Sequence, residues 1–289
     1  MQTFQDKVAA VTGAASGMGR TLAVELAKRG CHLALSDVND AELVKTAEMA
    51  SAHGVRVTIT QLDVANREAV FAWADQVAKD HGKVNLVFNN AGVSLTVPLE
   101  TVKQSDFDWI MGINFWGVVY GTQAFLPHLK ASGDGHVINT SSVFGLISVP
   151  GQGTYNASKF AVRGYTEALR MELDMEGCGV SATCVHPGGI KTNIAMAGKV
   201  DPSMQKLTGV DTETQKRRAN KAINVTTAES AALQILAAVE KNQRRVLVGP
   251  DARMIDKIVR VLGSWYQPVI MRQLRKMNPP RRSEAQSAA

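Results

Sequence analysis

The chain has 289 residues, of which 45% are hydrophobic and 20% are charged, a composition typical of a soluble globular protein with a large core. Its net charge of +6 is concentrated at the end, because the residues from Lys241 onward carry 11 Lys and Arg against 3 Asp and Glu. The preceding residues carry 21 against 23, which argues against a surface built to bind nucleic acid.

The sequence also lacks the patterns of membrane, secreted and metal-binding proteins. No apolar run approaches the roughly 20 residues of a membrane span, and the start does not have the pattern of a secretion signal. Cys31, Cys178 and Cys184 match no metal-binding or disulfide spacing. We therefore expect a cytoplasmic protein with no metal ion.

The first predicted unit is a strand over 8–11, a glycine-rich turn and a helix that ends at Gly30. Gly13, Gly17 and Gly19 would let the backbone approach a pyrophosphate, whose charge the helix N-terminus would stabilise. Their spacing, G-x-x-x-G-x-G, departs from the general dinucleotide pattern G-x-G-x-x-G. A turn that only packs the helix on the strand is the alternative.

The next predicted strand, over 32–36, ends at Asp37, about 20 residues beyond the glycines. A carboxylate there would accept hydrogen bonds from the ribose hydroxyls of a dinucleotide and would repel a 2′-phosphate. Ser16 and Val38 are not basic, and we interpret Arg20, the one nearby cation, as solvated. We therefore expect NAD rather than NADP, although Asp37 could instead cap the following helix, predicted over 39–52.

Strands and helices then continue to alternate along the chain. A strand over 55–62 precedes Asp63 and Val64, a helix spans 66–81, and a strand over 84–88 precedes NNAG at 89–92. Asp63 could accept a hydrogen bond from the adenine amino group, and the asparagines could tie strand ends together. This alternation predicts an α/β protein with one doubly wound parallel sheet, helices on both faces, and a ligand crevice at the carboxyl ends of the strands.

A possible catalytic pair lies at the start of a helix predicted over 155–176. Tyr155 and Lys159 are four residues apart, so their side chains project from the same helix face. A phenol has a pKa of about 10, and a nearby positive charge lowers it, so Tyr155 could exchange protons near neutral pH. On its own, the spacing Y-x-x-x-K is also a frequent accident.

The motifs TGAASGMG at 12–19, NNAG at 89–92, the serines at 141 and 142, YNASK at 155–159 and PGGIKT at 187–192 together resemble the short-chain dehydrogenase/reductase family. The resemblance covers about Lys7 to Thr192, with a weaker trace to Val248. It implies a Rossmann fold and four catalytic residues. Ser142 would bind the substrate oxygen, Tyr155 would be the general acid or base, Lys159 would hold the nicotinamide ribose, and Asn114 would organise a water chain.

Several of these roles have alternatives. Ser141 competes with Ser142, which has the separation from Tyr155 that the family uses. Asn114 could be a buried structural amide. We interpret His186, before Pro187, as structural. The resemblance implies cofactor contacts at Gly13, Ser16, Gly17, Met18, Gly19, Asp37, Asp63, Val64, Asn90, Ala91, Gly92, Tyr155, Lys159, Pro187, Gly188, Ile190 and Thr192.

The expected substrate pocket combines residues after NNAG and after Ser142 with a lid over about 193–226. Its predicted residues are mostly uncharged and apolar, and include Ser94, Val143, Phe144 and Gln152. Lys216, Arg217, Arg218 and Lys221 in the lid could meet an anionic substrate group, although a solvated helix face is the favoured interpretation.

Two predicted helices, over 107–129 and 155–176, are apolar around most of their circumference. In this family such helices pair between subunits, so we expect a homodimer or homotetramer. We divide the chain into a dehydrogenase domain over 1–250 and a basic amphipathic extension over 251–289 with a disordered end. The extension could pack on a partner subunit, which we favour, or contact an anionic membrane surface.

These features predict an NAD-dependent oxidoreductase that interconverts a secondary alcohol and a ketone. The apolar pocket favours a small-molecule substrate with a bulky hydrophobic body, such as an aryl, terpenoid or steroid-like compound. The alternatives are a 3-hydroxyacyl thioester dehydrogenase or 3-oxoacyl reductase, which the basic lid supports, and a non-catalytic dinucleotide sensor.

Overall fold

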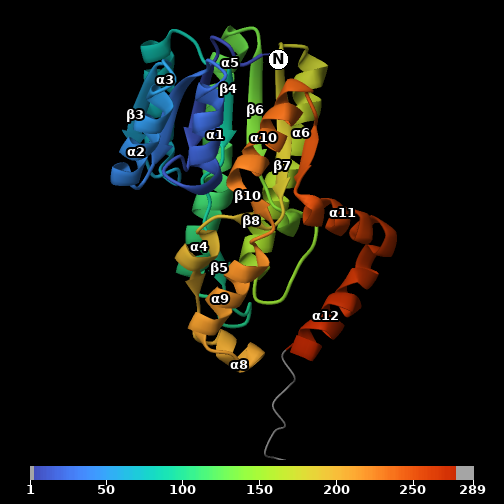
Figure 1. Ribbon diagram of the computed structural model, residues 1–289. Helices are drawn as coiled ribbons and strands as arrows, with labels where there is room; N and C mark the ends of the chain where they lie inside the picture. The colour runs from blue at the N-terminus through green and yellow to red at the C-terminus, as the bar shows by residue number, and fades with distance from the viewer. Residues whose placement is uncertain (1–2, 278–289) are drawn as a thin grey trace, which may run out of the picture.

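A computed structural model describes residues 3–277 of the chain, and a seven-stranded sheet forms its centre (Figure 1). The strands are β1 (Val8–Thr12), β2 (His32–Asp37), β3 (Val57–Gln61), β4 (Leu86–Asn89), β6 (Gly135–Thr140), β7 (Val180–Pro187) and β11 (Arg245–Val248). They are all parallel, in the order β11-β7-β6-β4-β1-β2-β3. The strand order reverses direction at β1 and β4, where such sheets bind ligands beyond the strand ends.

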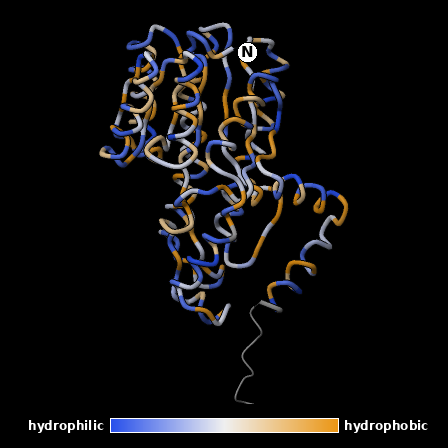
Figure 2. Tube along the Cα trace, viewed as in Figure 1, coloured by the Kyte–Doolittle hydropathy of each residue, from blue (hydrophilic) through white to orange (hydrophobic). Residues whose placement is uncertain are grey.

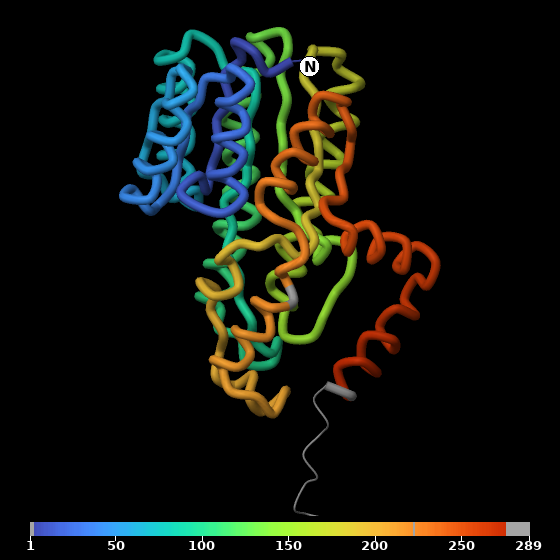
Figure 3. Tube along the Cα trace, in the orientation of Figure 1, coloured from blue at the N-terminus to red at the C-terminus, as the bar shows by residue number. Residues whose placement is uncertain are grey.

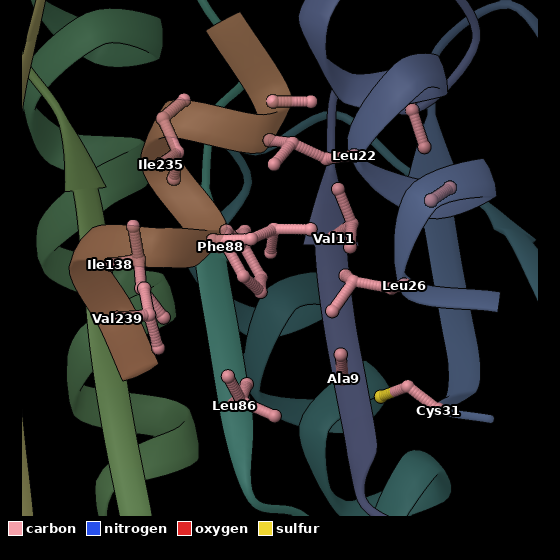
Figure 4. Close-up of a cluster of buried hydrophobic side chains, with 14 of the residues drawn as sticks. Ala9, Val11, Leu22, Leu26, Cys31, Leu86, Phe88, Ile138, Ile235 and Val239 are labelled. Carbon is pink, nitrogen blue, oxygen red and sulfur yellow. The ribbon is translucent and has the colours of Figure 1, made fainter. Parts of the chain in front are cut away.

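Two layers of helices cover the sheet, as the continuous apolar strands require. The odd-numbered β1 residues Ala9 and Val11 join one buried cluster, and Val8 and Ala10 join another on the opposite face. Figure 4 shows part of the first cluster. Its helices are α1 (Gly17–Ala27), α2 (Asp40–Ser51) and α10 (Ala228–Glu240), and those of the second are α3 (Arg67–His81), α5 (Gly117–Ala131) and α6 (Gly153–Glu176). The predicted doubly wound parallel sheet is confirmed.

The helix ends follow local sequence signals. The side chains of Asn39 and Asn66 accept hydrogen bonds from the first turns of α2 and α3. The long helix α6 ends at Gly177, whose φ of 65° is typical of a glycine C-cap. Because these signals lie next to each other in the chain, the predicted bounds of these helices agree with the observed ones to within about two residues.

The helix predicted over 107–129 is observed as three consecutive segments. They are α4 (Gln104–Met111), a π-helical turn (Gly112–Trp116) and α5. A π-helical turn within an α-helix often marks a functional site. Here it contains Asn114, which is fully buried.

The predicted lid has its own short elements. These are α7 (Ile194–Ala197), β9 (Lys199–Val200), α8 (Met204–Thr208), α9 (Thr212–Ala222) and β10 (Thr226–Thr227). Strand β9 pairs with β5 (Leu95–Thr96), and β10 pairs with β8 (Ile190–Lys191). The lid is thus joined at both ends to segments that follow NNAG and Pro187.

After β11 the chain forms α11 (Pro250–Leu262), a 3-10 turn (Gly263–Trp265) and α12 (Tyr266–Met277), together called here the C-terminal extension. Apolar and polar residues alternate along both helices (Figure 2). Met254, Ile258, Val261 and Trp265 lie on an exposed strip of this extension. The predicted disordered end, 278–289, lies outside the described residues. No helix within 3–277 is long and apolar enough to cross a bilayer.

Candidate active site

The glycine-rich turn between β1 and α1 forms an open backbone cradle. Gly13 and Gly17 have φ angles of 67° and 51°, which favour glycine. A Cβ on Gly19 would overlap the carbonyl oxygen of Gly13. The first N–H groups of α1 have no partner within the helix, so the cradle fits a pyrophosphate. Ser16 is the exposed N-cap of α1, and Met18 packs against the core.

Asp37 ends β2 beside this cradle. Its Oδ2 accepts a hydrogen bond from the Ala15 backbone at 3.0 Å, and its Oδ1 accepts one from the Asn39 backbone at 3.0 Å. Asn39, not Asp37, caps α2. The Asp37 carboxylate is therefore held at the edge of the cradle, where it could also bind ribose hydroxyls.

Arg20 is not solvated, contrary to the prediction from the sequence. Its guanidinium contacts Glu42 Oε2 at 2.6 Å and Thr46 Oγ1 at 2.9 Å, and it also donates to the Ala15 carbonyl oxygen. Glu42 and Thr46 come from α2, more than 20 residues further along the chain, so spacing could not reveal them.

The NNAG segment is tied to the cradle through Thr12. The Thr12 hydroxyl accepts hydrogen bonds from the backbone of Asn90 at 3.0 Å and of Ala91 at 3.1 Å. Asn90 Nδ2 in turn donates to the Thr12 carbonyl oxygen at 3.0 Å. After the end of β3, Asp63 is exposed, while Val64 is buried and lies against Gly117.

Asparagines join the neighbouring strand ends, as predicted. Asn89 Nδ2 donates to Asn139 Oδ1 at 2.8 Å, and Asn139 Nδ2 donates to Thr166 Oγ1 at 3.0 Å. These side chains are buried, where an unpaired amide would be costly, so their bonds fix β4, β6 and α6 in one arrangement.

Ser142 and Tyr155 lie together where β6 ends and α6 begins. Ser142 Oγ accepts a hydrogen bond from the Phe144 backbone at 3.1 Å, and the Phe144 ring packs edge-on against Tyr155 with centroids 6.0 Å apart. The competing Ser141 is 1% exposed, and its hydroxyl donates to the Lys159 carbonyl oxygen at 2.8 Å. Ser141 therefore holds α6, and Ser142 is the serine beside Tyr155.

Lys159 and Asn114 converge behind Tyr155. Lys159 Nζ donates to the Thr140 carbonyl oxygen at 2.9 Å and lies 5.7 Å from the Tyr155 ring centroid. Asn114 accepts from the Val93 backbone at 2.8 Å and donates back to the Val93 carbonyl oxygen at 3.0 Å. A Cβ on Gly92 would lie 3.3 Å from Asn114 Oδ1 and 3.6 Å from Lys159 Nζ, so both side chains approach this small residue.

Burial shifts both titratable groups toward their neutral forms. It raises the pKa of Tyr155 above its usual value, although a hydrogen bond with Ser142 acts in the opposite direction. Burial also lowers the pKa of Lys159 to about 8. The predicted lowering of the Tyr155 pKa is thus wrong for the protein alone. The reason is that desolvation of the phenol outweighs other effects, while the Lys159 ammonium is itself desolvated and bonded to Thr140.

His186 contacts the backbone of Ser142. Its Nδ1 lies 2.8 Å from the Ser142 carbonyl oxygen, and its Nε2 lies 3.3 Å from Cys184 Sγ. Burial lowers the pKa of His186 to about 4, so the ring is neutral and its Nδ1–H can donate to Ser142. His186 is structural, as predicted, but the sequence offered no signal that its partner is Ser142.

The segment after β7 is held by the start of α11. Gly188 N donates to the Val248 carbonyl oxygen at 3.0 Å, and Gly189 N donates to Asp251 Oδ2 at 2.6 Å. Beyond Pro187, Ile190 is 4% exposed and packs in the core, while Thr192 lies across from Gly17 of the cradle. Asp251 was not predicted as a site residue. An acidic residue in a first helical turn suggests only a helix start.

A cavity of about 270 Å³ lies between the lid, the residues after NNAG and the end of α12. Ser94 and Gln152 line it, as predicted, whereas Val143 and Phe144 are not among its walls. The lining is less apolar than expected, because it includes three cations, and none of the described residues lining it is acidic. It consists of Ser94, Thr96, Pro150, Gln152, Ala195, Gly198, Lys199, Val200, Thr208, Val210, Gln215, Lys216, Arg218, Ala219 and Leu274.

Comparison with known families decides the class of the chain. The short chain dehydrogenase family matches residues 7–202. The chain belongs to the short-chain dehydrogenase/reductase family.

Relatives of this short-chain dehydrogenase/reductase cover nearly its whole length. SadH of Mycobacterium tuberculosis, an oxidoreductase by name, is 46% identical over 279 residues, which are 96% of this chain and 99% of SadH. A family member from Burkholderia phymatum, crystallised with NAD, has a TM-score of 0.84 and 31% identity, covering 92% of this chain and 97% of its own. A levodione reductase has a TM-score of 0.75 and 27% identity, covering 86% and 99%.

This short-chain dehydrogenase/reductase is therefore an oxidoreductase, and its relatives support a nicotinamide dinucleotide as cofactor. The glycine cradle fits that group, because a Cβ on Gly13 would overlap the Ala91 backbone and one on Gly19 the Gly13 carbonyl oxygen, so glycine is needed to keep this turn geometry.

Proposed function

We propose that this protein is an NAD-dependent dehydrogenase or reductase that interconverts a secondary alcohol and a ketone. The observation that carries the proposal is the convergence of Ser142, Tyr155 and Lys159 at the end of β6, with Asn114 behind them. The glycine cradle opens at the same edge of the sheet, so a substrate and a dinucleotide would meet there.

In ketone reduction, the Ser142 hydroxyl would donate a hydrogen bond to the substrate carbonyl oxygen, and Tyr155 would transfer its phenolic proton to that oxygen. The raised pKa of Tyr155 keeps the phenol protonated at neutral pH, as a proton donor requires. In alcohol oxidation Tyr155 would first have to ionise, and its phenolate would then accept the hydroxyl proton. Lys159 would bind the nicotinamide ribose, and Asn114 would order a water chain to solvent. When bound, the dinucleotide would supply or accept the hydride.

The preference for NAD over NADP rests on Asp37 and Arg20. Asp37 places a carboxylate beside the cradle, where a 2′-phosphate would be repelled. Arg20 is already paired with Glu42, so it is a poor partner for that phosphate.

A bulky hydrophobic substrate is the favoured class. The Phe144 ring packs edge-on against the Tyr155 ring, which places an apolar side chain next to the proposed proton donor, outside the walls of the cavity. The proposed substrate class rests on this neighbour of Tyr155.

A second candidate is a 3-hydroxyacyl thioester dehydrogenase. Lys199, Lys216 and Arg218 line the cavity, and Lys216 Nζ donates to a neutral partner, the Met196 carbonyl oxygen, at 3.2 Å. A thioester with an anionic tail would find complementary charge there. Lys199 and Arg217 support this less than Lys216, because they pair with Asp106 and Glu213.

Initial rates of NADH or NADPH formation test the function. Wild type is assayed with NAD and with NADP against short alcohols, aryl carbinols, hydroxysteroids and 3-hydroxyacyl thioesters. We expect turnover of bulky neutral alcohols with NAD, and activity confined to thioesters would favour the second candidate. Tyr155→Phe should lower kcat by about 100-fold or more while NAD still binds. Absence of turnover by wild type, with NAD bound, would instead support a non-catalytic dinucleotide sensor.

We further propose that the catalytic domain ends near residue 250 and that the protein assembles as a homodimer or homotetramer. The exposed strip on α11 and the following 3-10 turn, formed by Met254, Ile258, Val261 and Trp265, would pack against a second subunit. The neighbouring exposed cations Arg253 and Lys257 leave contact with an anionic membrane surface as the alternative.

A further inference from the structure

The C-terminal extension contacts the active-site segments of its own chain. Its first contact is at the start of α11, where Asp251 Oδ2 accepts the hydrogen bond from Gly189. Gly189 lies between Pro187 and Ile190, in the segment proposed to contact the dinucleotide. The extension therefore begins on the cofactor side of the site.

The second contact holds the turn that follows the catalytic serine. The hydroxyl oxygen of Tyr266, the first residue of α12, accepts a hydrogen bond from the Ser148 backbone at 3.0 Å. Ser148 belongs to the segment 143–152, which connects Ser142 to the helix of Tyr155. Figure 3 shows this segment between the lid and the extension.

The third contact is with the cavity. Leu274, two turns beyond Tyr266 on α12, lines it together with Ser94, Gln152 and Lys216. Tyr266, Ile270 and Leu274 are spaced by four residues and are all partly buried, so they form the inner face of α12. Val269, Arg272 and Arg275 are exposed on the remaining surface of the helix.

We propose that α12 is the outer wall of the substrate site and that Leu274 limits the length of the apolar substrate that fits. The site would accept an extended hydrophobic body that starts at Tyr155, passes Gln152 and ends at Leu274. The inner face of α12 extends the apolar surface that Ala195, Val200, Val210 and Ala219 of the lid contribute to the cavity. This inference rests on the proposed alcohol dehydrogenase function.

Substrate length provides the first test. The kcat/KM with NAD is measured for secondary 2-alkanols of increasing chain length in wild type, Leu274→Trp and a matched control, Val269→Trp. The control adds the same bulk to the exposed side of the same helix. We expect Leu274→Trp to lower kcat/KM about tenfold or more for long alcohols and less than about twofold for short ones. Val269→Trp should leave kcat/KM unchanged for both long and short alcohols. Equal profiles for the two variants would overturn the proposal.

Hydrogen–deuterium exchange provides a second test that does not depend on turnover. Tyr266→Phe keeps the ring but removes the hydroxyl that accepts from Ser148, so exchange in the segment 143–152 should become up to about tenfold faster. Tyr120→Phe on α5 is the control. If wild type oxidises no alcohol, the proposed function is wrong. Unchanged exchange in Tyr266→Phe would then overturn the role of α12 independently.

Discussion

Lys159 donates a hydrogen bond to the carbonyl oxygen of Thr140 over 2.9 Å, which joins helix α6 to the end of β6 inside the protein. Lys159 is 3% exposed, and burial lowers the pKa of its ammonium to about 8. An unfolded lysine has a pKa of about 10.4. The charge that the proposed chemistry uses therefore destabilises the folded protein.

Replacing Lys159 should thus stabilise the fold in a pH-dependent way. Because the folded pKa lies below the unfolded one, the destabilisation is complete below pH 8 and disappears as the pH rises toward about 10.4. We expect Lys159→Met to raise Tm by roughly 5 °C at pH 7, with a difference from wild type that shrinks above pH 8. Thermal unfolding of wild type and Lys159→Met between pH 7 and about pH 10 measures this difference in Tm. The exposed Lys79→Met is the control, and a Tm difference that does not vary with pH would contradict the explanation.

The geometry of the glycine cradle should determine the affinity for NAD. In Gly19→Ala the new methyl group would overlap the Gly13 carbonyl oxygen, so the turn must shift away from the geometry that fits a pyrophosphate. We expect the Kd for NAD to increase between about 5-fold and 150-fold, as a shift costing about 1–3 kcal/mol implies. NADH fluorescence titration measures this. Gly164→Ala in α6 is the control, because its added Cβ meets nothing within 4 Å. Equal affinities in the two variants would contradict the cradle.

Cofactor preference can be altered through Asp37 and Glu42. Asp37→Ser removes the carboxylate beside the cradle and should lower kcat/KM with NAD about tenfold, as expected for lost charged hydrogen bonds. The additional change Glu42→Gln removes the charged partner of Arg20 and should increase activity with NADP. The ratio of kcat/KM for the two cofactors is the measurement, with the exposed Asp40→Ser as control. An unchanged ratio in the double variant would refute the assignment.

The outer face of α6 predicts self-association. Phe160, Met171 and Met175 share one side of this helix and are 39%, 59% and 89% exposed. Light scattering should show a dimer or tetramer for wild type, and Met171→Asp should reduce the assembled fraction at least about tenfold by placing a charge in the interface. Met49→Asp, at an exposed position of α2, should leave assembly intact. A monomeric wild type would show that this face has no partner copy.

The sequence alone was sufficient to predict those features of the structure that depend on residues close together in the chain. The alternation of strands and helices, the glycine turn, and the projection of Tyr155 and Lys159 from one helix face all depend on residues that are neighbours in the chain. The same holds for the caps of α2 and α3. The family motifs then identified the candidate site residues. The structure brings these residues, Asn114, Ser142, Tyr155 and Lys159, into one region.

Tertiary structure decided the features that depend on distant partners and on exclusion of water. Arg20 meets Glu42 only after α1 and α2 have packed, and the Tyr155 pKa rises because the folded protein desolvates the phenol. The sequence predicts that the extension contacts another subunit or a membrane. In the structure, however, the Tyr266 hydroxyl accepts a hydrogen bond from Ser148 of the same chain. Amphipathic spacing specifies that a helix face needs cover, whereas the packed fold determines what covers it.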